Sequence, residues 1–165
     1  MVVDADDCVS KYLAEFVEPH HQGDGWFFNK GYEYKDGSNF IYFRTEKFYL
    51  HCGTSNIIRY DFCQIPENPE TIEEEKLSIY AAPHHKILKI MAKRGAMIDP
   101  LPFAGAVYII NNGENNYSRG RSLLEGLYNY KEAILIAKEV YKGFNSKFLT
   151  RAIRDEFGLY DTKIG

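Results

Sequence analysis

The sequence predicts an α+β fold: an antiparallel meander sheet of four to five strands, packed on one face by helices, with a long helical region toward the C-terminus. Residues 26–62 are dense in aromatic side chains, with 12 among 37 residues. Turn-forming residues divide this stretch into short runs, as expected of neighbouring strands. Outside it, apolar residues recur at three- and four-residue spacing, which indicates amphipathic helices.

Length and composition predict one globular domain over residues 1–165. The chain has 165 residues, of which 45% are hydrophobic and 26% charged, enough to bury a core. The net charge of -3 hides an asymmetry, because residues 1–82 hold 15 acidic and 7 basic residues, whereas residues 83–165 hold 8 and 13. The basic second half either binds an anionic partner or neutralises the acidic first half within the fold.

The first half predicts one helix followed by the sheet. Val9, Leu13, Phe16 and Val17 fall at helical spacing between an Asp-rich start and Pro19. Asp36-Gly37 is a favourable hairpin turn. Strands are expected near residues 26–34, 39–44, 47–52 and 57–64.

The middle of the chain predicts two helices and a buried strand. Asn68-Pro69 offers a helix cap and a proline at the first helical position, so a helix is expected from there to residue 82. A second helix is expected over 84–94, closed by Gly95 in the left-handed conformation. The apolar run 103–111 predicts a strand buried on both faces, which would join the meander.

The C-terminal region predicts two further helices. Ser122 and Glu125 form a capping box that opens a long helix ending at Gly143. Asn145 and Ser146 can cap a last helix that ends at Gly158 and turns Phe148, Leu149 and Phe157 inward. We expect both helices to cover one face of the sheet.

Basic residues make anion binding one candidate function. They recur at helical spacing in two segments, and a third group precedes the capped helix. If they converge on one surface, they would bind a nucleic acid or another polyanion. If they are separate, each is an ordinary solvated helix face. The candidate anion-binding residues are Lys86, Lys89, Lys93, Arg119, Arg121, Lys147, Arg151 and Arg154.

Tyrosines on the sheet make protein binding the leading candidate. Tyr34, Tyr42 and Tyr49 are expected on its outer face, and exposed tyrosine is typical of protein interfaces. Edge-strand pairing with a partner or a second copy would then be natural. The predicted function is therefore a non-enzymatic module that binds a protein partner, or its own copy, through the aromatic sheet.

A small Cys/His hydrolase is the remaining alternative. Cys8 near a helix start would be the nucleophile and His51 on a following strand its base. Asp6 and Asp7 would raise rather than lower the pKa of the Cys8 thiol, however. This pattern favours binding over catalysis.

No motif indicates a metal, a cofactor or a membrane. The three cysteines lack C-x-x-C spacing, and adjacent histidines such as His20-His21 and His84-His85 point apart. No apolar stretch reaches the ~20 residues that a membrane-spanning helix needs. The first ten residues contain three Asp and no basic residue, unlike a signal peptide. A cytoplasmic protein without metal or cofactor is expected.

Overall fold

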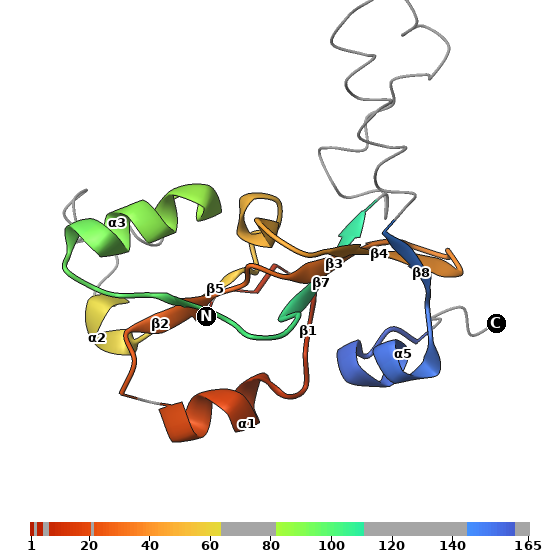
Figure 1. Ribbon diagram of the computed structural model, residues 1–165, viewed down its shortest axis with the longest axis horizontal. Helices are drawn as coiled ribbons and strands as arrows, with labels where there is room; N and C mark the ends of the chain where they lie inside the picture. The colour runs from red at the N-terminus through yellow and green to blue at the C-terminus, as the bar shows by residue number, and fades with distance from the viewer. Residues whose placement is uncertain (2, 5–6, 21, 64–81, 111–144, 161–165) are drawn as a thin grey trace, which may run out of the picture.

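The computed structural model has an α+β architecture built on two small sheets (Figure 1). It describes residues 1, 3–4, 7–20, 22–63, 82–110 and 145–160. The expected helices over 69–82 and 122–143 therefore lie outside the described residues.

The larger sheet has five strands in the order β1-β7-β3-β4-β8. Antiparallel pairs join β1 to β7, β3 to β4, and β4 to β8, whereas β3 and β7 run parallel. The expectation of a purely antiparallel meander is therefore wrong. The apolar strand β7 lies inside the sheet between β1 and β3, a pairing between segments far apart in the sequence. The strands are β1 (Cys8–Val9), β3 (Gly31–Lys35), β4 (Phe40–Arg44), β7 (Ala106–Ile110) and β8 (Ser146–Phe148).

The smaller sheet has three strands in the order β5-β2-β6. Its members are β2 (Gly25–Phe27), β5 (Asn56–Ile58) and β6 (Asp99–Pro100), with β2 antiparallel to β5 and parallel to β6. The single strand expected over 26–34 is thus two strands in different sheets. The amide of Phe28, directly after β2, donates to the carbonyl of Ser55 at 2.8 Å. Beyond this hydrogen bond the chain leaves the smaller sheet.

Short helices connect the strands in the first half of the chain. They are α1 (Leu13–Val17), η1 (Glu18–His20), η2 (Phe48–Leu50) and α2 (Tyr60–Cys63). The expected first helix is therefore shorter, because Cys8–Val9 pairs with β7 instead. The strand expected over 47–52 is replaced by the 3-10 turn η2. The strand expected near 57–64 corresponds to the shorter β5, which begins at Asn56 and ends at Ile58.

The remaining helices are η4 (His84–Lys86), α3 (Ile87–Lys93) and α5 (Arg151–Phe157). Gly95 and Gly158 follow α3 and α5 with φ of 77° and 69°. The expected left-handed closure at Gly95 is confirmed, and the last helix ends at Gly158 as expected. The last helix begins later than expected, because residues 146–148 form strand β8. Thr150 is its cap, accepting a hydrogen bond from the amide of Ile153 at 3.3 Å.

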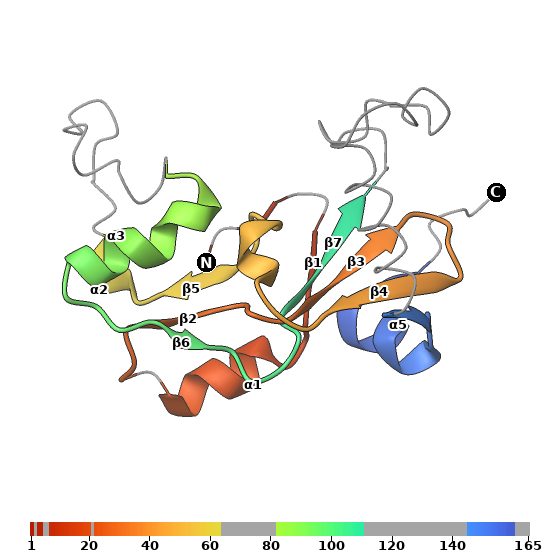
Figure 2. The ribbon, with the colours of Figure 1, turned by 45° about the horizontal axis from the view of Figure 1, so that its top comes forward.

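The hydrophobic core lies in three neighbouring clusters. Helix α5 covers one face of the larger sheet, where Phe157 and Leu159 pack against Tyr34, Ile41 and Val107. Helix α1 lies beneath the smaller sheet (Figure 2) and contributes Leu13 to a cluster with Trp26, Phe28 and Phe48. A third cluster lies around Met91 of α3 and includes Ile58 of β5 and Phe62 of α2. The expectation that the C-terminal helix packs on one face of the sheet is confirmed for α5.

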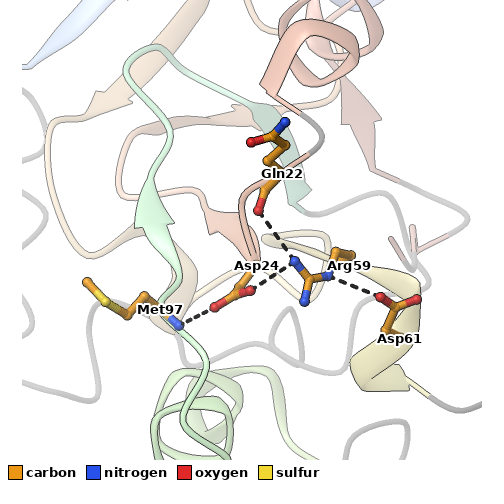
Figure 3. A network of polar contacts seen from close by, with 5 residues as sticks. All are labelled: Gln22, Asp24, Arg59, Asp61 and Met97. Atoms are coloured by element: carbon orange, nitrogen blue, oxygen red, sulfur yellow. Dashed lines mark hydrogen bonds and ion pairs between the residues drawn. The ribbon is translucent and has the colours of Figure 1, made fainter.

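A polar network ties β5, α2 and the segment before β6 together (Figure 3). The Nη1 atom of Arg59 lies 3.2 Å from Oδ1 of Asp24, and its Nε lies 3.4 Å from Oδ2 of Asp61. Nη1 also donates to the carbonyl of Gln22 at 3.4 Å, while Oδ2 of Asp24 accepts the amide of Met97 at 2.8 Å. Both carboxylates of this network form ion pairs with Arg59, so we assign the network to stability.

Candidate functional site

The two faces of the larger sheet differ in what they present. Side chains alternate between faces along a strand, and Tyr34 and Ile41, which form a cross-strand pair, point toward α5. Their neighbours therefore point to the opposite face, including Glu33 and Tyr42 in one cross-strand pair and Phe40 and Phe148 in another. This opposite face contains the candidate site.

Phe40 of β4 and Phe148 of β8 form an exposed aromatic pair at the edge of the sheet. Their ring centroids lie 4.8 Å apart with an interplanar angle of 34°. Phe40 is 50% exposed and Phe148 is 71% exposed, so packing within the described chain leaves much of both rings accessible. We call Phe40, Phe148 and the neighbouring Lys147 of β8 the β4–β8 edge.

An ion pair fixes the next row of this face. The Nε of Arg44 donates to Oε1 of Glu33 at 2.9 Å, and its Nη2 contacts the same oxygen. Glu33 is 7% exposed, and a carboxylate so buried needs a cation nearby. The Arg44 guanidinium also lies over the Tyr42 ring, 5.5 Å from its centroid. Tyr42 is thereby held half-buried beside the edge.

Cations flank the aromatic pair. Lys147 is exposed, points to the α5 side of the sheet, and places Nζ 4.5 Å from the centroid of the Phe43 ring. Arg151 opens α5 three residues after Phe148, and its side chain is 93% exposed, with Nε 3.7 Å from Oδ2 of Asp155. Such an exposed pair holds Arg151 weakly. Lys35, on the same face as Glu33, is exposed where β3 ends.

The three tyrosines expected on the outer face do not share a surface. Tyr34 is 4% exposed and lies in the core under α5, so its expected exposure is wrong. Tyr42 is half-buried on the opposite face, as described above. Tyr49 lies in η2, where its ring packs edge-on against the ring of Phe27, with 5.1 Å between the ring centroids. Of the three, Tyr42 alone adjoins the β4–β8 edge.

The candidate anion-binding residues fall into two separate groups. Lys86, Lys89 and Lys93 are exposed on η4 and α3. Lys147, Arg151 and Arg154 lie at β8 and α5, and both views place α3 and α5 at opposite ends of the molecule (Figures 1 and 2). Arg154 is only partly exposed and donates to the carbonyl of Leu159 at 3.1 Å. Lys147 is on a strand rather than a helix, and Arg119 and Arg121 lie outside the described residues. The two helical segments do not combine into one basic surface.

The surroundings of Cys8 do not favour nucleophilic catalysis. Cys8 is on strand β1 rather than at a helix start, and burial followed by the charge of Asp7 raises the pKa of its thiol. His51 follows the 3-10 turn η2 rather than lying on a strand. The adjacent Cys52 is fully buried, and its thiol donates to Oδ2 of Asp7 at 3.2 Å. A raised thiol pKa lowers the thiolate fraction, which is the nucleophilic species.

The described ranges contain neither a metal-binding cluster nor a membrane-spanning helix. There, no three His, Cys, Asp or Glu side chains gather closely enough to hold a metal ion. None of the helices in this part of the chain has the length and hydropathy needed to cross a bilayer.

The sequence identifies neither Phe40 nor Phe148 as a residue of the site, and for Phe148 the reason is local. Phe148 fits the helical spacing of Leu149, Ile153 and Phe157, so it was assigned to the inner face of a helix. Pairing of residues 146–148 with β4 instead turns Phe148 to the face opposite α5. The available signal was Thr150, an alternative helix cap that leaves residues 146–148 free to be extended.

The described geometry therefore offers an aromatic strand edge flanked by cations. No protein-family model matches the sequence, and no curated protein or solved structure is significantly similar to it.

Proposed function

We propose that this protein is a non-enzymatic binding module that engages a protein partner through the β4–β8 edge. The observation that carries this proposal is the exposed pair Phe40–Phe148 on the last two strands of the sheet. Two large apolar rings held together in water favour an occupant that removes them from solvent. Aromatic residues of this kind commonly contribute most of the affinity of a protein interface.

The residues around the aromatic pair favour specific binding over non-specific hydrophobic association. The Glu33–Arg44 ion pair and the stacked Tyr42 fix the row beside it. Polar and charged groups around a small apolar centre are the usual arrangement of a non-obligate interface. A preorganised surface also loses less conformational entropy on binding.

Capture experiments with the full chain test the proposal. Three proteins are immobilised: the wild type, the double variant Phe40→Ala/Phe148→Ala and the control Met97→Ala. Met97 is a suitable control because it is also a large exposed hydrophobic residue, with 77% exposure. We expect a protein that the wild type and the control retain and the double variant loses. That protein, once purified, should bind the double variant at least roughly tenfold more weakly, as truncation of a central aromatic residue costs over 1 kcal/mol.

Two results would contradict the proposal. In one, the double variant, folded by circular dichroism, binds every partner of the wild type with unchanged affinity. In the other, the edge retains single-stranded oligonucleotides and no protein, because aromatic rings beside lysines also stack on bases. A dimer of the wild type that the double variant abolishes, measured by sedimentation velocity, would support the proposal with a second copy as the partner.

A further inference from the structure

The outer side of β8 presents the backbone groups of Phe148 as well as side chains. β8 is the last strand of its sheet, and among the described strands it pairs with β4 alone. The amide of Phe43 donates to the carbonyl of Asn145 at 3.2 Å, and the amide of Leu149 donates to the carbonyl of Asn39 at 2.9 Å. Residues 145, 147 and 149 thus direct their backbone groups toward β4, and the alternation of the ladder turns those of Phe148 away from it.

The side chains along this edge alternate in chemistry as well as in direction. Phe148 lies on the face opposite α5, together with Phe40. Lys147 lies on the α5 face, and the exposed Arg151 follows at the start of α5. A strand laid beside β8 would therefore meet an apolar surface on one face and cations on the other.

From this arrangement we infer that the partner contributes an extended acidic segment, which adds to the sheet as a strand beside β8. The inference rests on the proposed function and specifies its partner. Apolar residues of the segment lie beside Phe148, whose ring packs on Phe40, and the alternate acidic residues lie near Lys147 and Arg151. Backbone hydrogen bonds to Phe148 supply affinity, and the alternation of side chains supplies specificity.

A second copy of this chain could also pair with β8, but the charges along this edge disfavour it. Pairing β8 with another β8 brings Lys147 of both copies onto neighbouring strands, and Arg151 follows at the start of each α5. Like charges on neighbouring strands are unfavourable, and lysine on an edge strand is a known barrier to self-pairing. An acidic segment turns the same residues into favourable contacts.

Synthetic peptides test this inference on the full chain. The probes are peptides of about six residues, a typical strand length: alternating Glu and Val, a block peptide of the same composition, and alternating Lys and Val. Binding is followed by chemical shifts and by hydrogen exchange of the Phe148 amide. We expect the alternating Glu/Val peptide to bind more tightly than both others and to slow exchange of this amide.

Charge reversal tests the role of the cation. Lys147→Glu should weaken binding of the Glu/Val peptide by roughly fivefold and tighten binding of the Lys/Val peptide, as expected from cross-strand charge pairs. Lys89→Glu on the distant α3 is the matched control and should change neither affinity. Equal effects of the two substitutions would mean that only net charge matters and would overturn the inference.

Peptides methylated on alternate backbone nitrogens test the strand geometry. Only every second amide of an added strand faces β8, so methylating one alternate set should abolish binding and methylating the other should leave it intact. If the added strand is antiparallel to β8, methylation of the valine nitrogens should abolish binding. If it is parallel, methylation of the glutamate nitrogens should do so. Equal tolerance or equal loss for both sets overturns strand addition. If the captured partner still requires Phe40 and Phe148 in that case, the proposed function stands and only this inference fails.

Discussion

Gly31 at the start of β3 lies directly against the ring of Phe48, so a Cβ atom on residue 31 would come within 2.5 Å of that ring. Phe48 is fully buried at the start of η2 and packs in the cluster around Trp26 and Phe28. The absence of a side chain at residue 31 is what allows the 3-10 turn to cover this end of the sheet.

Gly31→Ala should therefore destabilise the fold by overpacking. We expect a loss of about 1–3 kcal/mol in the free energy of unfolding, measured by denaturant titration. In the Phe48→Leu background the same substitution should cost less, because the two changes share one contact. Additive costs in the double variant would mean that the Phe48 ring does not restrict residue 31.

Tyr34 should contribute to stability and not to binding. Its hydroxyl accepts the amide of Gly37 at 3.2 Å and closes the turn between β3 and β4, while its ring is buried under α5. Tyr34→Phe should lower the free energy of unfolding by about 0.5–1.5 kcal/mol, the usual net value of one hydrogen bond. Partner binding should be unchanged. Weaker binding by a stably folded Tyr34→Phe variant would return this residue to the interface.

The sequence predicts the local features of this fold better than the pairings between distant segments. The turn at Asp36-Gly37, strand β4, and the terminations at Gly95 and Gly158 follow from residues within a few positions, where turn and capping preferences act. The parallel pairing of β3 with β7 joins residues 32 and 107, and no local pattern reports such a contact. The same limit hid β8, whose pairing with β4 overrides the helical spacing around Phe148.

The sequence and the structure place exposed aromatic side chains on different residues of the sheet. The sequence predicts exposed tyrosines on a sheet whose strands run through residues 26–64, and side chains along a regular strand alternate between its two faces. The break between β2 and β3 and the turn η2 interrupt that alternation. As a result, Tyr34 points into the core and Tyr49 leaves the sheet, whereas Phe40 and Phe148 point outward.

Asp24 should be the most costly carboxylate to remove from the Arg59 network. It contacts both Arg59 and the amide of Met97, whereas Asp61 is 77% exposed and contacts Arg59 alone. Asp24→Ala should lower the free energy of unfolding by about 1–3 kcal/mol, because it leaves the amide of Met97 without its acceptor and removes one of the partners of Arg59. Asp61→Ala should cost less than about 1 kcal/mol, as for exposed ion pairs. Equal costs in thermal or denaturant unfolding would contradict this division.

Cys8 and Cys52 should both resist alkylation in the folded protein, Cys52 more strongly. Burial is the largest cause of the raised thiol pKa at both positions, and the charge of Asp7 raises the pKa of each further. Iodoacetamide labelling at pH 8, followed by peptide mass spectrometry in a Cys63→Ser background, should modify Cys8 slowly and Cys52 only after unfolding. Asp7→Asn removes the neighbouring negative charge and should accelerate labelling of Cys8 in the folded state.

The same raised thiol pKa values set the direction of a pH dependence. Below the ordinary thiol pKa of about 8.5, both folded and unfolded states keep the thiols protonated, and their contribution to stability is fully present. As the pH rises above that value, the unfolded chain releases thiol protons that the folded chain retains, so the free energy of unfolding falls. Replacing both cysteines by Ala should flatten this alkaline loss, measured as the denaturant midpoint between about pH 7 and 10. An identical alkaline slope in the two proteins would show that ionisation of these thiols is not coupled to unfolding.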